Sequence, residues 1–188
     1  MSYMLSIMLG LTGILDLSSL TSVGTSGLYY AFSGCTGLTG ANLSSLTSIG
    51  GYGAYGIFNG CTGLTGILDL SSLTSVGDYG FYVAFNNCIR LTGVNLSSLT
   101  SIGNYGFSNA FGLCIRLTDV YFNSLTTTSF GSFISQFSSM LANTGTSSTH
   151  TLHFPSNLES TIQGLTGYPT FGGTSGYVVL AFDLPATS

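Results

Sequence analysis

The chain has 188 residues and a formal net charge of −4, and only 4% of its residues are charged, against roughly a quarter in a typical soluble domain. Its two arginines are too few to neutralise a row of phosphates, so a nucleic-acid-binding protein is excluded. Insertion into a membrane is not expected, because no apolar run approaches about 18 residues. With 44% hydrophobic residues, the chain still has enough apolar side chains for a folded core.

Residues 1–10 form the first predicted unit, an N-terminal cap or the start of a first turn. Met1–Met8 is apolar but lacks the basic region and the cleavage site of a signal peptide. We therefore see no leader here. An apolar, charge-poor end of this kind also favours self-association with a second chain.

An internal repeat organises residues 11–141. Leu-Thr-Gly recurs in steps of 27, 26 and 27 residues, and Leu117-Thr118-Asp119 continues the series after a further 26. Cysteine and phenylalanine follow the same period, which makes chance agreement untenable. Five repeats of 26–27 residues are therefore predicted.

Each repeat predicts one short strand. In Leu68-Asp69-Leu70 the side chains alternate apolar, polar, apolar, so the leucines face inward and Asp69 outward. Leu73 and Val76 return to the core after a serine turn. Gly80–Phe85 is expected to form one short helical turn that presents Phe81 and Phe85. The longer repeats carry their surplus residue at the strand entry, where a bulge would absorb it.

Residues 142–188 diverge from the repeat and are expected to form a C-terminal cap. Thr151–Pro155 and Ala181–Pro185 each restore the alternation and end in proline, so we predict a sixth and a seventh strand. Ser156–Gly164 between them is expected to be a short capped helix with Glu159 in its first turn.

A period of 20–29 residues with one strand per turn is typical of a leucine-rich-repeat solenoid. The chain resembles the bacterial BspA-like (Treponema-type) leucine-rich repeats in its Cys61-Thr62-Gly63-Leu64 opening and its Ala84-Phe85-Asn86-Asn87-Cys88 closure. The expected fold is a right-handed solenoid. A single parallel sheet of about seven short strands forms one face, and loops and short helical turns form the other.

The outward side of that sheet is the predicted ligand-binding site. Acids, amides, an aromatic ring and an imidazole on one regular surface suit hydrogen bonding to glycans or peptides. Tyr121 beside Asn95 offers a flat apolar surface next to fixed donors and acceptors. An alternative is that stacked Asp and Asn side chains bond to one another and stiffen the sheet. The predicted row is Asp16, Asn42, Asp69, Asn95, Tyr121, His153 and Asp183.

Three further sets of residues are of types that can form a site. Arg90 and Arg116 occupy one repeat position in adjacent turns, so they either contact an anion or are simply solvated beside Asp119. The histidines at 150 and 153 are expected as a loop and a surface residue. The cysteines are expected to be free and buried in a column, without disulfides and without a metal site: Cys35, Cys61, Cys88 and Cys114.

Several functions are compatible with these features. The resemblance implies a non-catalytic binding or adhesion module of a bacterial or phage surface protein. Such a module is extracellular, cell-surface or virion-associated, and its partner is a host-surface glycan or protein. An assembly component, such as a phage tail or surface-layer piece, is the alternative. A row of threonines from Thr12 to Thr118 leaves an ice- or crystal-binding surface as a third. No cofactor and no enzymatic activity are expected, because no catalytic dyad or cofactor motif stands out.

Overall fold

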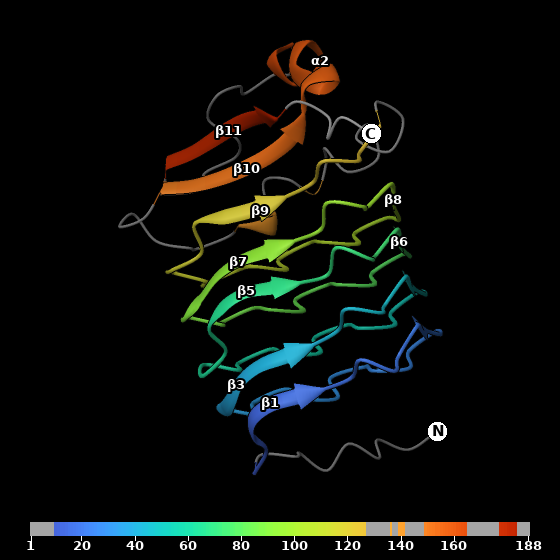
Figure 1. The fold of residues 1–188 in the computed structure, drawn as a ribbon, viewed down its shortest axis with the longest axis vertical. Helices are drawn as coiled ribbons and strands as arrows, with labels where there is room; N and C mark the ends of the chain where they lie inside the picture. The colour runs from blue at the N-terminus through green and yellow to red at the C-terminus, as the bar shows by residue number, and fades with distance from the viewer. Residues whose placement is uncertain (1–9, 127–135, 137–138, 142–148, 165–176, 184–188) are drawn as a thin grey trace.

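The structure is a computed structural model that describes residues 10–126, 136, 139–141, 149–164 and 177–183. Successive turns of the chain stack into an elongated solenoid (Figure 1). We number the complete turns coil 1 (residues 11–37), coil 2 (38–63), coil 3 (64–90) and coil 4 (91–116), and coil 5 begins at Leu117. The strands run from left to right on the near side of Figure 1 while the coils climb toward the C-terminal end, so the coil is right-handed.

Seven parallel strands form one face of the stack, which we call the strand face. The β1–β3 pair and the five-stranded order β11-β10-β9-β7-β5 lie in one layer (Figure 1), and the backbone amide of Thr65 joins them by donating to the carbonyl of Thr39 at 3.1 Å. The predicted sheet of about seven strands is therefore confirmed. Its members are β1 (Thr12–Asp16), β3 (Gly37–Asn42), β5 (Gly66–Asp69), β7 (Leu91–Asn95), β9 (Asp119–Tyr121), β10 (Thr149–Pro155) and β11 (Tyr177–Asp183).

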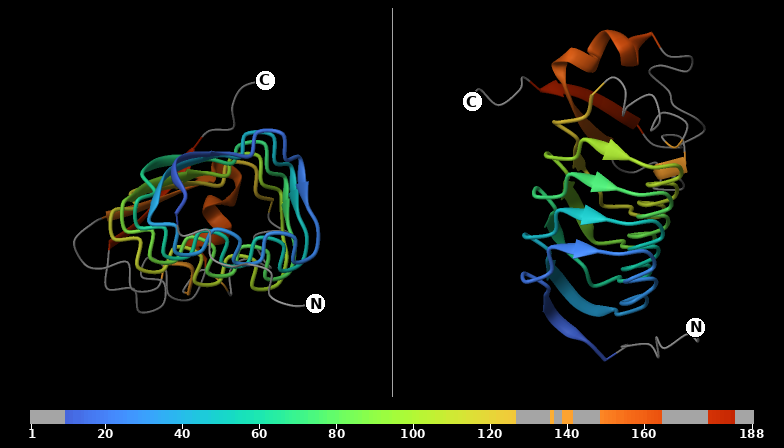
Figure 2. Two further views of the ribbon diagram at one scale, coloured as in Figure 1. Left: turned by 90° about the horizontal axis from the view of Figure 1, so that it is seen from below. Right: turned by 90° about the vertical axis from the view of Figure 1, so that its right-hand side faces the viewer.

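A second side of coils 1 to 4 carries a two-residue strand, where the sequence predicts only the return to the core after a serine turn. These strands pair in parallel in the order β2-β4-β6-β8, and they are visible as a ladder of short arrows in Figure 2 (right). Each has an outward serine and an inward valine or isoleucine. They are β2 (Ser22–Val23), β4 (Ser48–Ile49), β6 (Ser75–Val76) and β8 (Ser101–Ile102).

The third side, which we call the turn side, closes each coil with a zigzag that is seen end-on along the lower edge of Figure 2 (left). Here the Gly80–Phe85 segment is a succession of hydrogen-bonded turns, not the expected helical turn. One residue in four has a positive φ, as at Tyr79 (55°), Val83 (47°) and Asn87 (61°). Alternate amides donate to the next coil, as Tyr79 N does to Asn104 O at 2.8 Å, so the backbone is satisfied without a helix.

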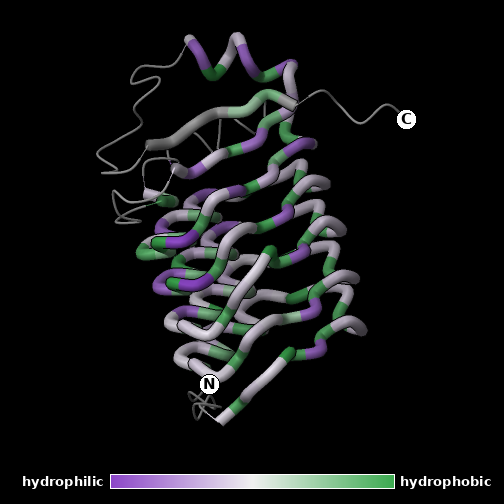
Figure 3. Tube along the Cα trace, turned by 60° about the vertical axis from the view of Figure 1, so that its left-hand side comes forward, coloured by the Kyte–Doolittle hydropathy of each residue, from purple (hydrophilic) through white to green (hydrophobic). Residues whose placement is uncertain are grey.

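Leucines and phenylalanines from all three sides fill the interior, and equivalent positions of successive coils share the same hydropathy (Figure 3). The rings of Phe58, Phe85 and Phe111 stack along the axis with centroids 6.0 and 5.5 Å apart. All three rings are fully buried. The phenylalanine period in the sequence therefore marks a continuous aromatic column.

The predicted bulges are confirmed. The register between paired strands shifts at Gly13/Ile14 and at Gly66/Ile67, where the longer coils carry their extra residue. Both glycines have a positive φ, 78° and 74°, which lets the backbone make the kink. The kink leaves Ile14 and Ile67 pointing outward on the strand face, 72% and 59% exposed.

The segment after residue 148 continues the stack with β10 and β11. Between them lie the short helical segments η1 (Ser156–Leu158) and α2 (Glu159–Gln163). Glu159 lies in the first turn of α2, as expected, but no side chain caps the helix. The predicted side-chain cap at the start of this helix is therefore wrong. Glu159 instead accepts a hydrogen bond from Gln163 at 2.9 Å.

Candidate functional site

The acid and amide residues of the strand-face row all make the same local contact. One side-chain oxygen of each accepts a hydrogen bond from the backbone amide two residues later, at 3.0–3.2 Å, which is an Asx turn. In Asp16 this bond from Ser18 lowers the pKa of the carboxyl group. The turn that ends each strand therefore explains why Asp or Asn occupies this position in coils 1 to 4. The four residues are Asp16, Asn42, Asp69 and Asn95.

At coil 5 the row changes character. The ring of Tyr121 stacks on that of His153, with centroids 4.2 Å apart and planes at 19°. Nε2 of His153 lies 2.9 Å from a carboxylate oxygen of Asp119. Burial raises the pKa of Asp119, but the hydrogen bond from His153 and one from Thr118 outweigh it, so that pKa lies below its usual value. We call Asp119, Tyr121 and His153 the Tyr121 cluster.

The register of β11 differs from the predicted row. His153 pairs with Ala181, and Asp183 pairs with Pro155, two residues further along the strand. Asp183 therefore does not continue the row above His153, and its predicted position is wrong. The structure brings Asn95, Tyr121 and His153 together, since β7, β9 and β10 are adjacent and in register.

Both histidines lie in β10 and point to opposite sides of the sheet, as a spacing of three in a strand requires. His150 is not a loop residue, which corrects the prediction. It is 1% exposed, and its Nδ1 donates to the carbonyl oxygen of Leu117 at 2.6 Å. This hydrogen bond of the inward His150 helps to hold β10 against coil 5. The outward His153 belongs to the Tyr121 cluster.

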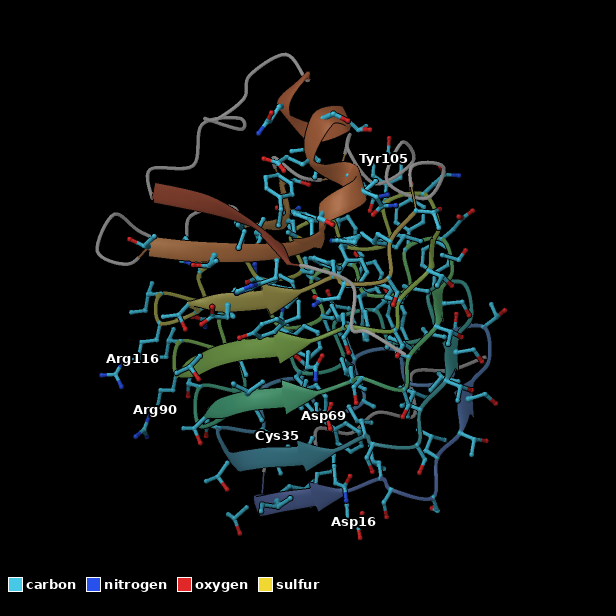
Figure 4. All side chains as sticks on the ribbon, turned by 45° about the horizontal axis from the view of Figure 1, so that its top comes forward. Asp16, Cys35, Asp69, Arg90, Tyr105 and Arg116 are labelled. Carbon is cyan, nitrogen blue, oxygen red and sulfur yellow. The ribbon has the colours of Figure 1, made fainter. Side chains whose placement is uncertain are left out.

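Arg90 and Arg116 are exposed, and both project outward from the edge where the strands begin (Figure 4). Among the described residues the one ion pair joins His153 to Asp119, so Asp119 is not the counter-ion of the arginines. Exposed Leu113 and Ile115 precede Arg116. The anion contact stays a prediction, beside the alternative of two solvated arginines.

The turn side carries a set of tyrosines that lies outside the predicted strand-face row and is the next candidate surface. Two columns of stacked rings run along the axis, with neighbouring centroids 4.8–5.0 Å apart within each column. The signal in the sequence is Tyr-Gly-x-Tyr, which occurs at residues 52–55 and 79–82; coil 1 keeps only the second tyrosine and coil 4 only the first. We call Tyr52, Tyr79 and Tyr105 the outer column, and Tyr29, Tyr55 and Tyr82 the inner column.

The four cysteines are free and buried, as predicted. The thiols of Cys61, Cys88 and Cys114 each donate to a phenylalanine carbonyl of the preceding coil at 3.0–3.2 Å. Burial raises the pKa of Cys61 and Cys114 to about 12 and that of Cys88 well above its ordinary value. These thiols are structural, because a buried, protonated thiol is a poor nucleophile and a poor metal ligand.

The threonine row of the strand face is tied to the backbone. The hydroxyls of Thr65 and Thr118 donate to the carbonyls of Thr39 and Thr92 in the preceding coils at 3.1 and 2.9 Å. Within the described part of the chain, no group of three potential ligands is placed to hold a metal ion, and no helix is both long and apolar enough to cross a bilayer.

The stacked parallel strands and the 26–27-residue period define a leucine-rich-repeat solenoid. Residues 25–158 match the model of the BspA type leucine rich repeat region in six copies, and the chain belongs to this family. No curated protein and no solved structure matches it. Repeats of this type suggest a protein-binding or adhesion-type module, are typically non-catalytic scaffolds, and are commonly found in surface proteins.

Proposed function

We propose that this chain is a non-catalytic binding module of a surface-exposed or virion-associated protein, and that it contacts a partner protein through the strand face around the Tyr121 cluster. The observation that carries the proposal is the stacked Tyr121–His153 pair with Asp119 beside it. It is the point where the repeated Asp/Asn turn residues give way to aromatic rings, which are enriched in protein interfaces.

The geometry of the cluster favours a peptide segment over a sugar ring. One face of the Tyr121 ring is stacked on His153, so a sugar cannot cover that face. On its other side in the row, Tyr121 is next to Asn95. A partner therefore meets ring edges, the Asp119 carboxylate and the Asn95 amide. Such groups hydrogen-bond well to peptide groups, and the cross-strand stack holds them in place before binding.

The test compares the full chain with a Tyr121→Ala, His153→Ala double variant on arrays of host-surface proteins and of glycans. We expect retention on a protein array that falls by about tenfold or more in the double variant, with a small change in melting temperature. Tyr105→Ala is the control, since it removes a ring that is more exposed than Tyr121 but lies on the turn side. Equal retention of the double variant, or retention on the glycan array alone, would refute the proposal.

A role in assembly is the second candidate, and exposed Ile14 and Ile67 favour it. Each isoleucine lies beside a glycine of the next coil, Gly40 or Gly93, so the lower strand face carries aliphatic side chains with little around them. Such exposed side chains favour contact between copies. Light scattering should then show oligomers that Ile14→Ser with Ile67→Ser dissociates; monomers at all concentrations would exclude this role. The predicted self-association through residues 1–9 lies outside the described residues.

A further inference from the structure

The outer tyrosine column ends abruptly at coil 1. Its three members occupy one position of coils 2, 3 and 4, and the equivalent residue of coil 1 is Ser26. The backbone confirms the equivalence, because φ is 56° at Ser26 and 56°, 55° and 54° at the three tyrosines. Ser26 also donates its amide to coil 2 just as Tyr52 does to coil 3, at 3.1 and 2.8 Å.

Among the described residues, this break leaves no aromatic ring on the coil 1 side of Tyr52 in the outer column. The ring stacks on Tyr79 at 4.8 Å and 8°, and it contacts Tyr55 in the inner column at 6.1 Å and 20°. On the coil 1 side it meets Ser26, whose side chain cannot cover an aromatic ring. The Tyr52 side chain is 41% exposed, whereas Tyr79 in the middle of the column is less exposed.

We propose that the coil 1 side of Tyr52 binds a neutral pyranose sugar of a polysaccharide. The ring face carries negative partial charge, and it attracts the C–H groups that line one face of a pyranose ring. Thr25 and Ser26 are exposed in the coil 1 segment next to Tyr52, since the Ser26 amide donates to Gly51 O at 3.1 Å, and their hydroxyls can bond the sugar hydroxyls. This site is independent of the Tyr121 cluster.

The charge of the surroundings selects a neutral ligand. Asp16 lies on the strand face, where its carboxylate closes an Asx turn, and exposed Asp78 lies in coil 3, where its carbonyl accepts the Tyr52 amide hydrogen at 2.8 Å. No cation is present among residues 10–63 to recognise an acidic sugar. An acidic sugar would bring a negative charge without a partner of opposite sign, so a neutral sugar is favoured.

The column itself prepares the site for binding. A tyrosine side chain has two rotatable bonds, and stacking on Tyr79 and Tyr55 fixes both before a ligand arrives. Little conformational entropy is then lost on binding, which favours measurable affinity from a single aromatic platform. The middle ring of the column, Tyr79, cannot serve in the same way, because it stacks on Tyr52 and on Tyr105.

The experiment is affinity electrophoresis of the full chain in native gels cast with laminarin, mannan or starch. We expect at least one of these neutral polysaccharides to retard the chain, and Tyr52→Ala to weaken that retardation by about tenfold or more. Ser26→Tyr is the sharper variant. Its backbone already has the conformation of the other tyrosine positions, so the new ring extends the column, covers Tyr52 and abolishes retardation while the melting temperature is kept or raised.

Two controls locate the effect. Tyr82→Ala removes a ring from the inner column but leaves both rings that contact Tyr52, and it should be retarded like the unmodified chain. Tyr121→Ala should also be retarded, because its ring lies on the strand face. The proposal is overturned if none of the three polysaccharides retards the chain, if Ser26→Tyr is retarded normally, or if Tyr121→Ala abolishes the effect.

Discussion

The phenylalanine column offers the most direct test of how the coils hold one another. Phe85 in coil 3 is fully buried and has three ring neighbours: Phe58 at 6.0 Å, Phe111 at 5.5 Å and Phe81 at 5.4 Å. In Phe85→Ala, coils 2 and 4 both lose their contact with the ring between them. The substitution therefore probes two coil interfaces at once.

The expected loss follows from these contacts. Removing a fully buried phenylalanine side chain forfeits about 2–3 kcal/mol of burial free energy, and each ring pair adds about 0.5 kcal/mol or more. We expect the free energy of unfolding to fall by about 4 kcal/mol, within the range of roughly 3–5 kcal/mol for such substitutions. Phe32→Ala at coil 1 is the matched control: its one stacked phenylalanine is Phe58, at 5.7 Å, and the ring is 8% exposed, so a smaller loss is expected.

Urea unfolding measures the global loss, and thiol labelling measures the local one. Because coils contact mainly their neighbours, part of the loss should appear as local opening. The thiol of Cys114 donates to the carbonyl of Phe85 itself, so its labelling rate should rise in Phe85→Ala more than that of Cys35 in coil 1. A stability change below about 1 kcal/mol would refute the packing argument, and equal acceleration of all four thiols would refute local opening.

Four other substitutions or titrations have defined outcomes. Burial, with the neighbouring phenols, raises the pKa of Tyr55 to about 12. The stability that the buried, protonated phenol contributes is full below the ordinary pKa of about 10 and is lost as pH rises toward 12. The urea midpoint should therefore fall between about pH 10 and pH 12. Asp69→Ala removes the bond to the Ser71 amide and should cost about 1 kcal/mol, whereas Asp69→Asn, measured beside it, should cost far less. Gly66→Ala meets no atom within 4 Å yet should cost about 1 kcal/mol through its φ of 74°, and an unchanged midpoint would contradict that. Native protein should label slowly with a thiol reagent and show four free thiols in urea, as the burial of Cys88 and its equivalents implies; two or none would contradict the free column.

Much of the fold could be predicted because the repeat carries two independent signals. The alternation around Asp69 gave the strand and its faces, and the one-residue surplus located the bulge at Gly66. Both signals report steric requirements that a strand cannot avoid. The turn side could not be predicted in the same way. Every fourth residue there has a left-handed conformation, and tyrosine and valine fill left-handed positions that composition would assign to glycine or asparagine.

The misplacement of Asp183 has a different cause. Pro155 and Pro185 appeared equivalent, which aligned Asp183 with His153, but the structure aligns Ala181 with it. A shift of two residues keeps every side chain on its original face, so the hydrophobic pattern of a strand cannot detect such an error. The Asp/Asn row was harder still, because an Asx turn and a ligand contact demand the same residue types. The bond to the amide two residues later distinguishes them, and it is visible only in the structure.

Departures from the repeat are therefore more informative about function than its constant positions. Positions that keep one residue type in every coil are accounted for by the solenoid: the cysteines bond the preceding coil, and the Asp/Asn residues close turns. Tyr121 stands where the preceding coils have Asp or Asn, and its ring stacks on His153. Ser26 stands where the following coils have tyrosine, although its backbone has the same conformation as theirs. Each exchange gives up a stabilising contact that the neighbouring coils retain. The repeat does not account for these two exchanges, so these two positions, on the strand face and on the turn side, are the ones at which binding should be sought first.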